Sequence, residues 1–258
     1  MQLPDLRYPA IASASVGAAL LAWLFASDHQ LVSRLLLPSP GDILTTADEL
    51  LAEGYVHVPL WQHFGISLVR ALSAFLAAAV TGVPIGLAMG MSSVANAALD
   101  PFVQFLRPLP KLALIPLVIV WFGIGELSKF LLIYLATVLT VIVAATAAVK
   151  SVKQGRIRAA QALGVNQYQL FRYVVFPSAL PELFTGIRVA IGIGWTTLIA
   201  AEMIAATSGL GWMVINASAY LRTDVVVIGI FLLGITGYLL DWILQVLQRV
   251  VVPWIGKD

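Results

Sequence analysis

The sequence predicts an all-α integral membrane protein with six transmembrane helices. The first observation is composition: 60% of the 258 residues are hydrophobic and only 11% are charged, whereas soluble domains usually carry about 25% charged residues. The second is a set of six apolar runs, each long enough to cross a hydrocarbon core about 30 Å thick. The third is that the connections between these runs differ sharply in basic residues, which indicates a fixed orientation in the membrane.

The same composition excludes several classes of protein. Six helices of about 20 residues use roughly 120 residues, which leaves no room for a large soluble catalytic domain. The formal net charge is only +2, so we expect no nucleic-acid partner. Cysteine is absent, so the chain forms no disulfide and no thiolate metal site.

The N-terminal segment, residues 1–62, is expected to hold an anchor helix and an external amphipathic helix. The anchor is the apolar run 10–26, and no small-x-small cleavage site closes it, which favours a retained anchor over a signal peptide. The amphipathic helix is expected at Ile43–Glu53, with Asp42 as its cap. This helix is expected either to lie on the membrane surface or to contact an external partner. Its apolar face is formed by Ile43, Leu44, Ala47, Leu50 and Leu51.

The remaining five spans form a predicted core over residues 63–248, and residues 249–258 are a short tail. Pro84 lies in the first span of this core, and the next span is interrupted by Pro108, Pro110 and Pro116. Carbonyls freed by such prolines must be satisfied inside protein or by water, which suits helices that line a cavity. The five spans are Phe64–Met91, Phe102–Phe122, Leu127–Val149, Leu183–Ala206 and Val225–Leu247.

Basic residues set the predicted orientation. The connection between the fourth and fifth spans is rich in Lys and Arg, and the tail adds Arg249 and Lys257. By contrast, five acidic residues and only Arg34 lie between the first two spans. Basic segments stay in the cytoplasm, so both termini are expected there. The basic residues of the fourth connection are Lys150, Lys153, Arg156, Arg158 and Arg172.

This basic connection, residues 150–181, is expected to be folded. Ser151–Leu163 has helical composition, and Gly164 fits the left-handed residue that ends a helix. Asn166 can cap a second short helix, Gln167–Tyr173. Pro177 and Pro181 are expected to end the connection, with Pro181 in the first turn of the fifth span. Two short helices joined in this way would project from the membrane as a rigid knob.

The knob carries a family signature. In ABC-importer permeases the signature reads E-A-A, three residues, G, nine residues, then I-x-L-P, and the spacing matches here. Arg158 stands where the family usually has Glu, which puts a carboxylate contact to the ATPase in doubt. The matching residues are Arg158, Ala159, Ala160 and Gly164, followed by Val174, Val175, Phe176 and Pro177. The sequence thus resembles an ABC-importer permease with the type I fold and cytoplasmic coupling helices.

The resemblance covers most of the chain and points to the nitrate, sulfonate and taurine branch of these permeases. Within that branch several stretches, including Arg158 in place of Glu, look most similar to the taurine permeases. The stretches typical of the branch are 37–40, 67–70, 107–110 and 121–126. Those most similar to taurine permeases are 86–90, 157–161 and 200–207.

The resemblance implies a function and a set of partners. The chain is expected to be the permease subunit of an ATP-driven importer in the bacterial inner membrane, moving a small sulfonate such as taurine. The alternatives are nitrate, bicarbonate or another alkanesulfonate. The implied partners are a second permease copy, two cytoplasmic ATP-binding subunits, an external substrate-binding protein and membrane lipid. The knob residues expected to couple to the ATPase are Arg158, Ala159, Ala160, Gly164, Val165, Asn166 and Pro177.

No catalytic residue or cofactor is expected in this chain. It lacks a G-x-x-x-x-G-K-[ST] loop, so ATP and Mg²⁺ are expected on the partner ATPase. Its three histidines, which are expected outside the membrane, show no metal-ligand spacing, so no metal site is expected. A self-sufficient secondary transporter is the alternative of a different class, but it would usually show repeated halves and several midplane charges. An intramembrane enzyme would need a histidine or paired-aspartate site inside the spans, and the predicted spans contain none.

Two charges inside the predicted spans are expected to pair. Arg70 lies about six residues, roughly 9 Å, into the second span, and Glu202 lies about four residues, roughly 6 Å, from the outer end of the fifth. Buried charges are costly and usually functional. The pair is expected to be either a structural ion pair or an outer gate on the translocation path.

Other residues of the spans are each expected to have a separate role. Arg188 is expected to reach the interface as a snorkelling side chain. Arg107 and Lys111 are expected either to mark the cytoplasmic end of the third span or to line the path for an anionic or zwitterionic substrate. Trp195, Thr196 and Thr197, next to small residues of the fifth span, are expected either to pack against another helix or to line the path. Those small residues are Gly186, Gly192 and Gly194.

Overall fold

The computed structural model describes residues 7–254, without the side chains of residues 7–10 and 12. These residues form two compact units, which are described separately. Unit 1 contains residues 7–63 and Met213–Leu232, and unit 2 contains Phe64–Trp212 and 233–254. The predicted basic residue Lys257 lies outside the described residues.

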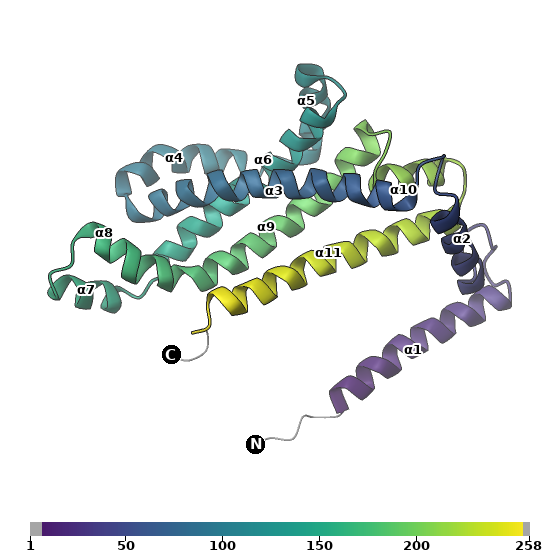
Figure 1. Ribbon diagram of the computed structural model, residues 1–258, viewed down its shortest axis with the longest axis horizontal. Helices are drawn as coiled ribbons and strands as arrows, with labels where there is room; N and C mark the ends of the chain where they lie inside the picture. Colours follow the sequence, from purple (N-terminus) through teal and green to yellow (C-terminus); the bar gives the residue numbers. More distant parts are fainter. Residues whose placement is uncertain (1–6, 255–258) are drawn as a thin grey trace. The chain divides into compact units, whose positions relative to one another are not determined.

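All regular elements of the described residues are helices, apart from an isolated bridge between Tyr55 and Val58. The α-helices are labelled in Figure 1. In chain order the regular elements are α1 (Arg7–Asp28), α2 (Pro40–Ala52), α3 (Leu60–Met91), α4 (Ser93–Leu106), η1 (Lys111–Leu114), α5 (Ile115–Phe122), α6 (Glu126–Lys150), α7 (Gln154–Ala162), α8 (Gln167–Gln169), η2 (Leu170–Val175), α9 (Phe176–Ala205), α10 (Leu210–Ala219) and α11 (Thr223–Val251).

Four helices in the described residues are long and apolar enough to cross a membrane, and a bent pair raises the number to at most five. The four are α3, the continuous segment 167–205, α6 and α11. The described apolar part of α1, Ser13–Asp28, is shorter than a span. The structure therefore supports four or five of the six predicted spans.

The predicted third span is not one straight helix. Helix α4 ends at Leu106, and the chain resumes in the segment Lys111–Phe122 at an angle of 85°. Pro108 and Pro110 lie in the break, and neither has an N–H to continue a helical ladder. Pro116 instead lies in the first turn of α5, where a proline is tolerated. The prolines thus bend this span at one place.

Helices α3 and α6 are held close by glycines one turn apart. A Cβ on Gly86 would lie 2.5 Å from the carbonyl oxygen of Ile142 and 2.6 Å from the Cβ of Ala145. The Thr146 hydroxyl donates to the carbonyl of Gly86 across the same contact, at 3.1 Å. Small residues allow backbones to approach in this way, so that van der Waals packing holds helices together where no hydrophobic driving force acts. Gly90 meets Val149 in the next turn.

Helix α9 packs along α6 and uses two of its three predicted small residues in that contact. Gly186 faces Ala144, and Gly194 faces Thr137 and the ring of Phe75. Gly192, by contrast, faces open space, with no atom within 4 Å of a Cβ placed there. Gly192 therefore contributes nothing to this packing.

The basic connection was predicted to extend to residue 181, but the long helix that follows it already begins at Gln167. Helix α7 stops at Ala162, and Gly164 has φ +78°, the left-handed conformation predicted for it. Asn166 caps α8 as predicted and exchanges hydrogen bonds with Gln169. From Gln167 the helix then continues without a break through one π-helical stretch to Ala205. No separate Gln167–Tyr173 helix exists, because Pro177 falls in the first turn of α9, where proline is tolerated.

The continuous segment 167–205 has 39 residues and is about 58 Å long, nearly twice the hydrocarbon thickness. Pro181 lies inside it and not at its start as predicted. In Figure 1 α7 and α8 lie together beyond one end of α6, at the start of this segment. A buried cluster that includes Ala160, Leu170 and Val175 attaches this end to α3 and α6.

In unit 1, α2 is longer than predicted and has a different cap. Ser39 is the N-cap, and Asp42 is the third residue of a reciprocal capping box with it. The hydrogen bond from Ser39 is the main reason that the pKa of Asp42 lies below its usual range. The buried residues of α2 are Thr46 and Leu50. Leu44 and Leu51, predicted for the apolar face, are exposed.

We predict that Gly86→Ala destabilises unit 2. The added methyl group would overlap the carbonyl of Ile142, and overpacking of this kind costs about 1–3 kcal/mol. The matched control is Gly65→Ala on the same helix, where no atom lies within 4 Å of the new Cβ. Thermal unfolding of the purified chain in detergent should show a lower melting temperature for Gly86→Ala only. Equal melting temperatures would contradict the close α3–α6 contact.

Candidate functional site

Four charged side chains meet where α3, α6 and α9 come together in unit 2. Arg70 of α3 lies between Glu126, the first residue of α6, and Glu202, near the end of α9. The Arg70 guanidinium donates from Nε to Glu126 Oε2 at 2.6 Å and from Nη1 to Glu202 Oε1 at 2.8 Å. Lys129, one turn along α6, donates to Glu126 Oε1 at 2.8 Å. We call these four residues, with Ser67, the Arg70 network.

Glu202 is the buried centre of the Arg70 network. Its side chain is 0% exposed, and its carboxylate also accepts the hydroxyl hydrogen bond of Ser67, at 2.8 Å. The N–H of Gly211 donates to Glu202 Oε2 at 2.9 Å, and the N–H of Leu210 donates to the Ser67 hydroxyl oxygen at 2.8 Å. The carboxylate therefore accepts from the first turn of α10, where helix N–H groups have no partner of their own.

The turn before α10 is shaped around this carboxylate. Gly209 has φ +115°, and a Cβ there would lie 2.6 Å from the Glu202 carboxyl carbon. Only glycine fits both the backbone conformation and the space. The carbonyl of Ser208 accepts from Arg70 Nη1 at 2.8 Å. The segment that follows α9 is thus held by Arg70 at the carbonyl of Ser208, and by Ser67 and Glu202 at the N–H groups of Leu210 and Gly211.

The Arg70 network is electrically balanced but unevenly buried. It contains two positive and two negative side chains, so burial leaves no net charge, as a low-dielectric environment requires. Arg70 is 7% exposed, whereas the side chain of Glu126 is 66% exposed. Arg70 and Glu126 form a bidentate pair, because Nη2 also donates to Glu126 Oε1 at 2.6 Å. The Arg70 network is therefore accessible from the Glu126 side, whereas Glu202 is buried.

The structure confirms the predicted contact between Arg70 and Glu202. Helix α3 begins at Leu60, four residues before the predicted span, so Arg70 lies about 15 Å from the helix start. Sequence reasoning missed Glu126 and Lys129 as partners. A signal for Glu126 was available, because 67–70, 121–126 and 200–207, three stretches that carry the family resemblance, meet in the Arg70 network, whereas Lys129 lies outside them.

The three consecutive residues predicted for the path face different directions. Trp195 and Thr197 are buried, and the indole N–H of Trp195 donates to the carbonyl of Leu233 on α11 at 3.2 Å. Thr196 is exposed. The structure therefore places Trp195 and Thr197 in packing positions, because a helix turns by about 100° per residue.

Arg188 is not a solitary snorkelling residue. It forms a bidentate ion pair with Asp241 of α11, with Nε–Oδ1 and Nη2–Oδ2 distances of 2.7 and 2.9 Å. Gln245 donates to the same carboxylate at 2.7 Å. Arg188 lies on one side of α9 with the exposed residues Gly192 and Thr196, at spacings of four residues that fall on one helical face.

Arg107 and Lys111 lie in the break between α4 and η1. Arg107 is the exposed C-cap of α4. The ammonium of Lys111 donates to the carbonyl of Arg107, which lacks a helical partner at this terminus. Both residues therefore lie in the break inside the predicted third span and not at its end, and the choice between marking the cytoplasmic end and lining the path stays a prediction.

The predicted coupling residues divide into an exposed and a buried group. Arg158, Ala159, Gly164 and Asn166 are exposed. Ala160 is buried in the cluster that attaches α7 to α3 and α6, so it positions the knob and cannot contact a partner directly. Val165 and Pro177 are half-buried. The most prominent apolar side chain is Leu163, at the C-cap of α7, which is 84% exposed.

Loss of the Arg70 guanidinium should destabilise the chain far more than loss of the Glu126 charge. Arg70→Gln leaves Glu202 buried without a cation, which costs about 3–5 kcal/mol. Glu126→Gln should cost less, because Arg70 keeps its pair with Glu202, although the buried Lys129 loses its carboxylate partner. Thermal unfolding in detergent should rank the melting temperatures as wild type, Glu126→Gln, then Arg70→Gln.

Adding Glu202→Gln to Arg70→Gln should restore part of the loss, because it removes the unpaired charge. Neutral variants suit this test better than an exchange of charges, because an arginine at position 202 could not accept from Gly211. Additive losses in the double variant would contradict direct coupling of the two side chains.

Residues 82–256 match the model of the family described as "Binding-protein-dependent transport system inner membrane component". The chain is 45% identical to the taurine transport system permease protein TauC of Escherichia coli K12, over 98% of this chain and 93% of that protein. It is 40% identical to the putative aliphatic sulfonates transport permease protein SsuC of Escherichia coli K12, over 90% and 87%. It is 31% identical to the nitrate import permease protein NrtB of Synechocystis, over 84% and 81%.

The fold also matches solved structures of an importer. An inward-facing structure of the MetNI methionine ABC transporter has a chain that superposes with a TM-score of 0.62, covering 72% of this chain and 92% of that chain at 21% identity. A second crystal form gives a TM-score of 0.61, covering 80% and 98%. Together with the family match over most of its length, this places the chain in the family of binding-protein-dependent transport system inner membrane components.

Proposed function

We propose that this chain is the permease subunit of an ATP-driven importer that moves a small sulfonate, with taurine as the first candidate, across the bacterial inner membrane. The observation that carries the proposal is the 45% identity to a taurine permease over nearly the whole chain. Identity falls to 40% for the aliphatic sulfonate permease and 31% for the nitrate permease. This order favours a sulfonate over nitrate.

The proposed partners follow from what this chain contains and what it lacks. It has no phosphate-binding loop, so ATP and Mg²⁺ bind two separate cytoplasmic subunits. The knob formed by α7 and the start of the 167–205 segment carries exposed Arg158 and Leu163, which suit a cleft in such a subunit. A second permease copy and an external substrate-binding protein complete the assembly that we propose.

The proposed orientation places the knob in the cytoplasm. Helix α6 ends at Lys150, and α7 adds Arg156 and Arg158 on its exposed side. Gln248, near the end of α11, donates to the carbonyl of Pro181 at 3.1 Å, so Arg249 belongs to the same end of unit 2. Basic residues gathered at one end favour the cytoplasmic side, and the Arg70 network then lies toward the outside. Both termini are cytoplasmic in this arrangement.

The proposed path runs along the exposed side of α9. Thr196, Gly192 and Arg188 share this side, and charged or hydroxyl groups in a span usually face a water-filled cavity or another protein surface. We propose that the Arg70 network is the outer gate of this path.

Taurine should stimulate ATP hydrolysis by the reconstituted importer. The experiment places the permease in liposomes with its ATPase and binding protein and compares taurine, alkanesulfonates and nitrate at equal concentrations. We expect the largest rise in phosphate release with taurine. A response to nitrate without one to taurine would contradict the proposed substrate. The absence of a response to any of these compounds in an assembled complex would contradict the proposed importer function.

Leu163→Asp should weaken the complex with the ATPase while leaving the permease folded. The side chain is almost fully exposed, so a charge there has little effect on folding but should cost roughly tenfold or more in affinity at an apolar contact. The matched control is Gly155→Ala, on the same helix and facing open space. Co-purification with the ATPase measures the effect. Equal recovery of both variants with the ATPase would exclude Leu163 from the contact.

A further inference from the structure

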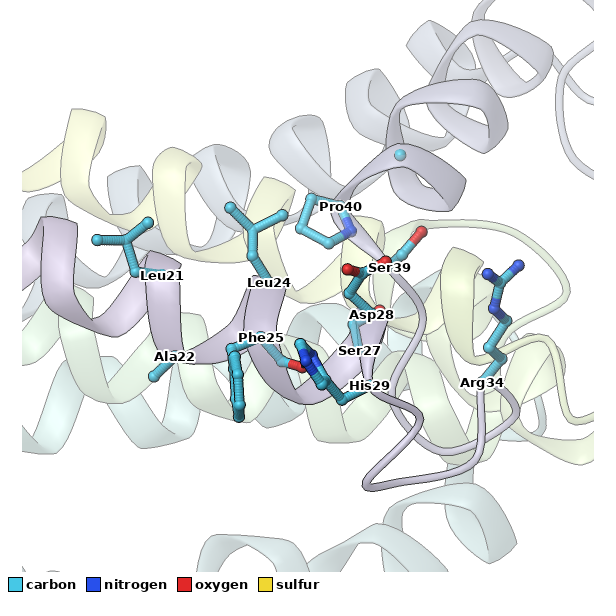
Figure 2. A pocket seen from close by; sticks show the side chains of 11 residues that line it. Leu21, Ala22, Leu24, Phe25, Ser27, Asp28, His29, Arg34, Ser39 and Pro40 are labelled. Atoms are coloured by element: carbon cyan, nitrogen blue, oxygen red, sulfur yellow. The ribbon is translucent and has the colours of Figure 1, made fainter.

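We infer that a pocket at the end of α1 binds the headgroup of one zwitterionic phospholipid with a primary ammonium group. The cavity has a volume of about 730 Å³ and lies between the last turns of α1, the loop that follows and the start of α2. All of these elements belong to unit 1. Figure 2 shows leucines of α1 leading to a group of polar side chains at the helix end.

The pocket is built and not an accidental gap. The indole N–H of Trp23 donates to the carbonyl of Pro38 at 3.1 Å, which holds the loop against α1. The ring of His29 stacks on Phe25 at a centroid distance of 4.0 Å. Ser27 is among the residues that line the pocket, it is only 2% exposed, and its hydroxyl oxygen has no hydrogen-bond partner in the described part of the chain. A buried hydroxyl without a partner is unfavourable, so this group is available to a ligand.

The charges in the pocket match a zwitterion. Asp28 and Arg34 both line it, and neither forms a side-chain hydrogen bond or salt bridge among residues 7–254. A guanidinium pairs well with a phosphate. A carboxylate accepts hydrogen bonds from a primary ammonium, which has three N–H donors, whereas a quaternary ammonium has none. The pair therefore suits phosphoethanolamine better than phosphocholine, and better than an anionic headgroup, which would leave Asp28 unpaired.

The surroundings of the pocket favour a lipid over a free zwitterion. Leu21, Leu24 and Phe25 form its apolar wall and are exposed along α1, where acyl chains can cover them. The loop after α1 exposes further large apolar side chains on both sides of Arg34, which suits the interfacial layer of a membrane. These side chains are Leu31, Val32, Leu35 and Leu36.

Native mass spectrometry of the full chain in detergent tests the inference. Phosphatidylethanolamine, phosphatidylcholine and phosphatidylglycerol with identical acyl chains are added in turn. We expect one molecule of phosphatidylethanolamine per chain, retained about tenfold better than the other two, the factor that one charge-assisted hydrogen bond can supply. Equal retention of phosphatidylethanolamine and phosphatidylcholine by the wild type would overturn the inference.

Substitutions of Asp28 and Arg34 test whether these two charges cause the preference for phosphatidylethanolamine. Asp28→Asn should retain phosphatidylethanolamine and phosphatidylcholine equally, and Arg34→Gln should lose retention of both. The matched control is Asp48→Asn on the exposed side of α2, which should behave like the wild type. Melting temperatures measured without lipid show that each variant is folded. If Asp28→Asn retains the wild-type preference, the assignment is wrong.

A control with soluble zwitterions distinguishes binding of a headgroup alone from binding of the whole lipid. Phosphoethanolamine and taurine, which are zwitterions without acyl chains, should neither displace the lipid nor raise the melting temperature at the lipid's concentration. If either binds as tightly as phosphatidylethanolamine, the apolar wall has no role and the site is one for a soluble zwitterion.

Discussion

A charge inside a membrane protein must be paired, and the rest of this structure depends on how Glu202 meets that requirement. Its buried carboxylate is satisfied by Arg70, by Ser67 and by the first turn of α10. These partners come from different helices, so burial of the carboxylate brings α3, α9 and the segment after α9 to one place. Arg70 then extends the arrangement to Glu126 and hence to α6. One ionic contact thus fixes the relative positions of three spans at one end.

The opposite end of the same helices is held by different forces. There α3 and α6 touch through Gly86 and Gly90, and the knob is attached by an apolar cluster that contains Ala160. A continuous helical segment, 167–205, connects the knob to the residue at the centre of the charge network. In the proposed importer this segment is the mechanical link between the ATPase and the outer gate, and α11 supports it along its length through Asp241 and Leu233.

Local signals in the sequence predicted most of the helices and part of the site. Gly164 and Asn166 each need only their own backbone neighbours to end or cap a helix, and both behave as predicted. Arg70 and Glu202 were predictable because charges within apolar runs must pair. Glu126 was missed because a charge at the edge of a span is usually interfacial, although it lies in one of the stretches that carry the family resemblance. The break before α5 follows from Pro108 and Pro110, whereas its angle of 85° and the unbroken 167–205 helix depend on tertiary contacts.

Hydrogen–deuterium exchange of the segment after α9 tests the central role of the buried carboxylate most directly. The amides of Leu210 and Gly211 donate to Ser67 and Glu202, so their exchange reports whether this end is held closed. The account predicts slow exchange in the wild type and exchange faster by roughly tenfold or more in Arg70→Gln, where the carboxylate loses its cation. Unchanged exchange in a folded Arg70→Gln protein would contradict the view that this ion pair holds the helices together.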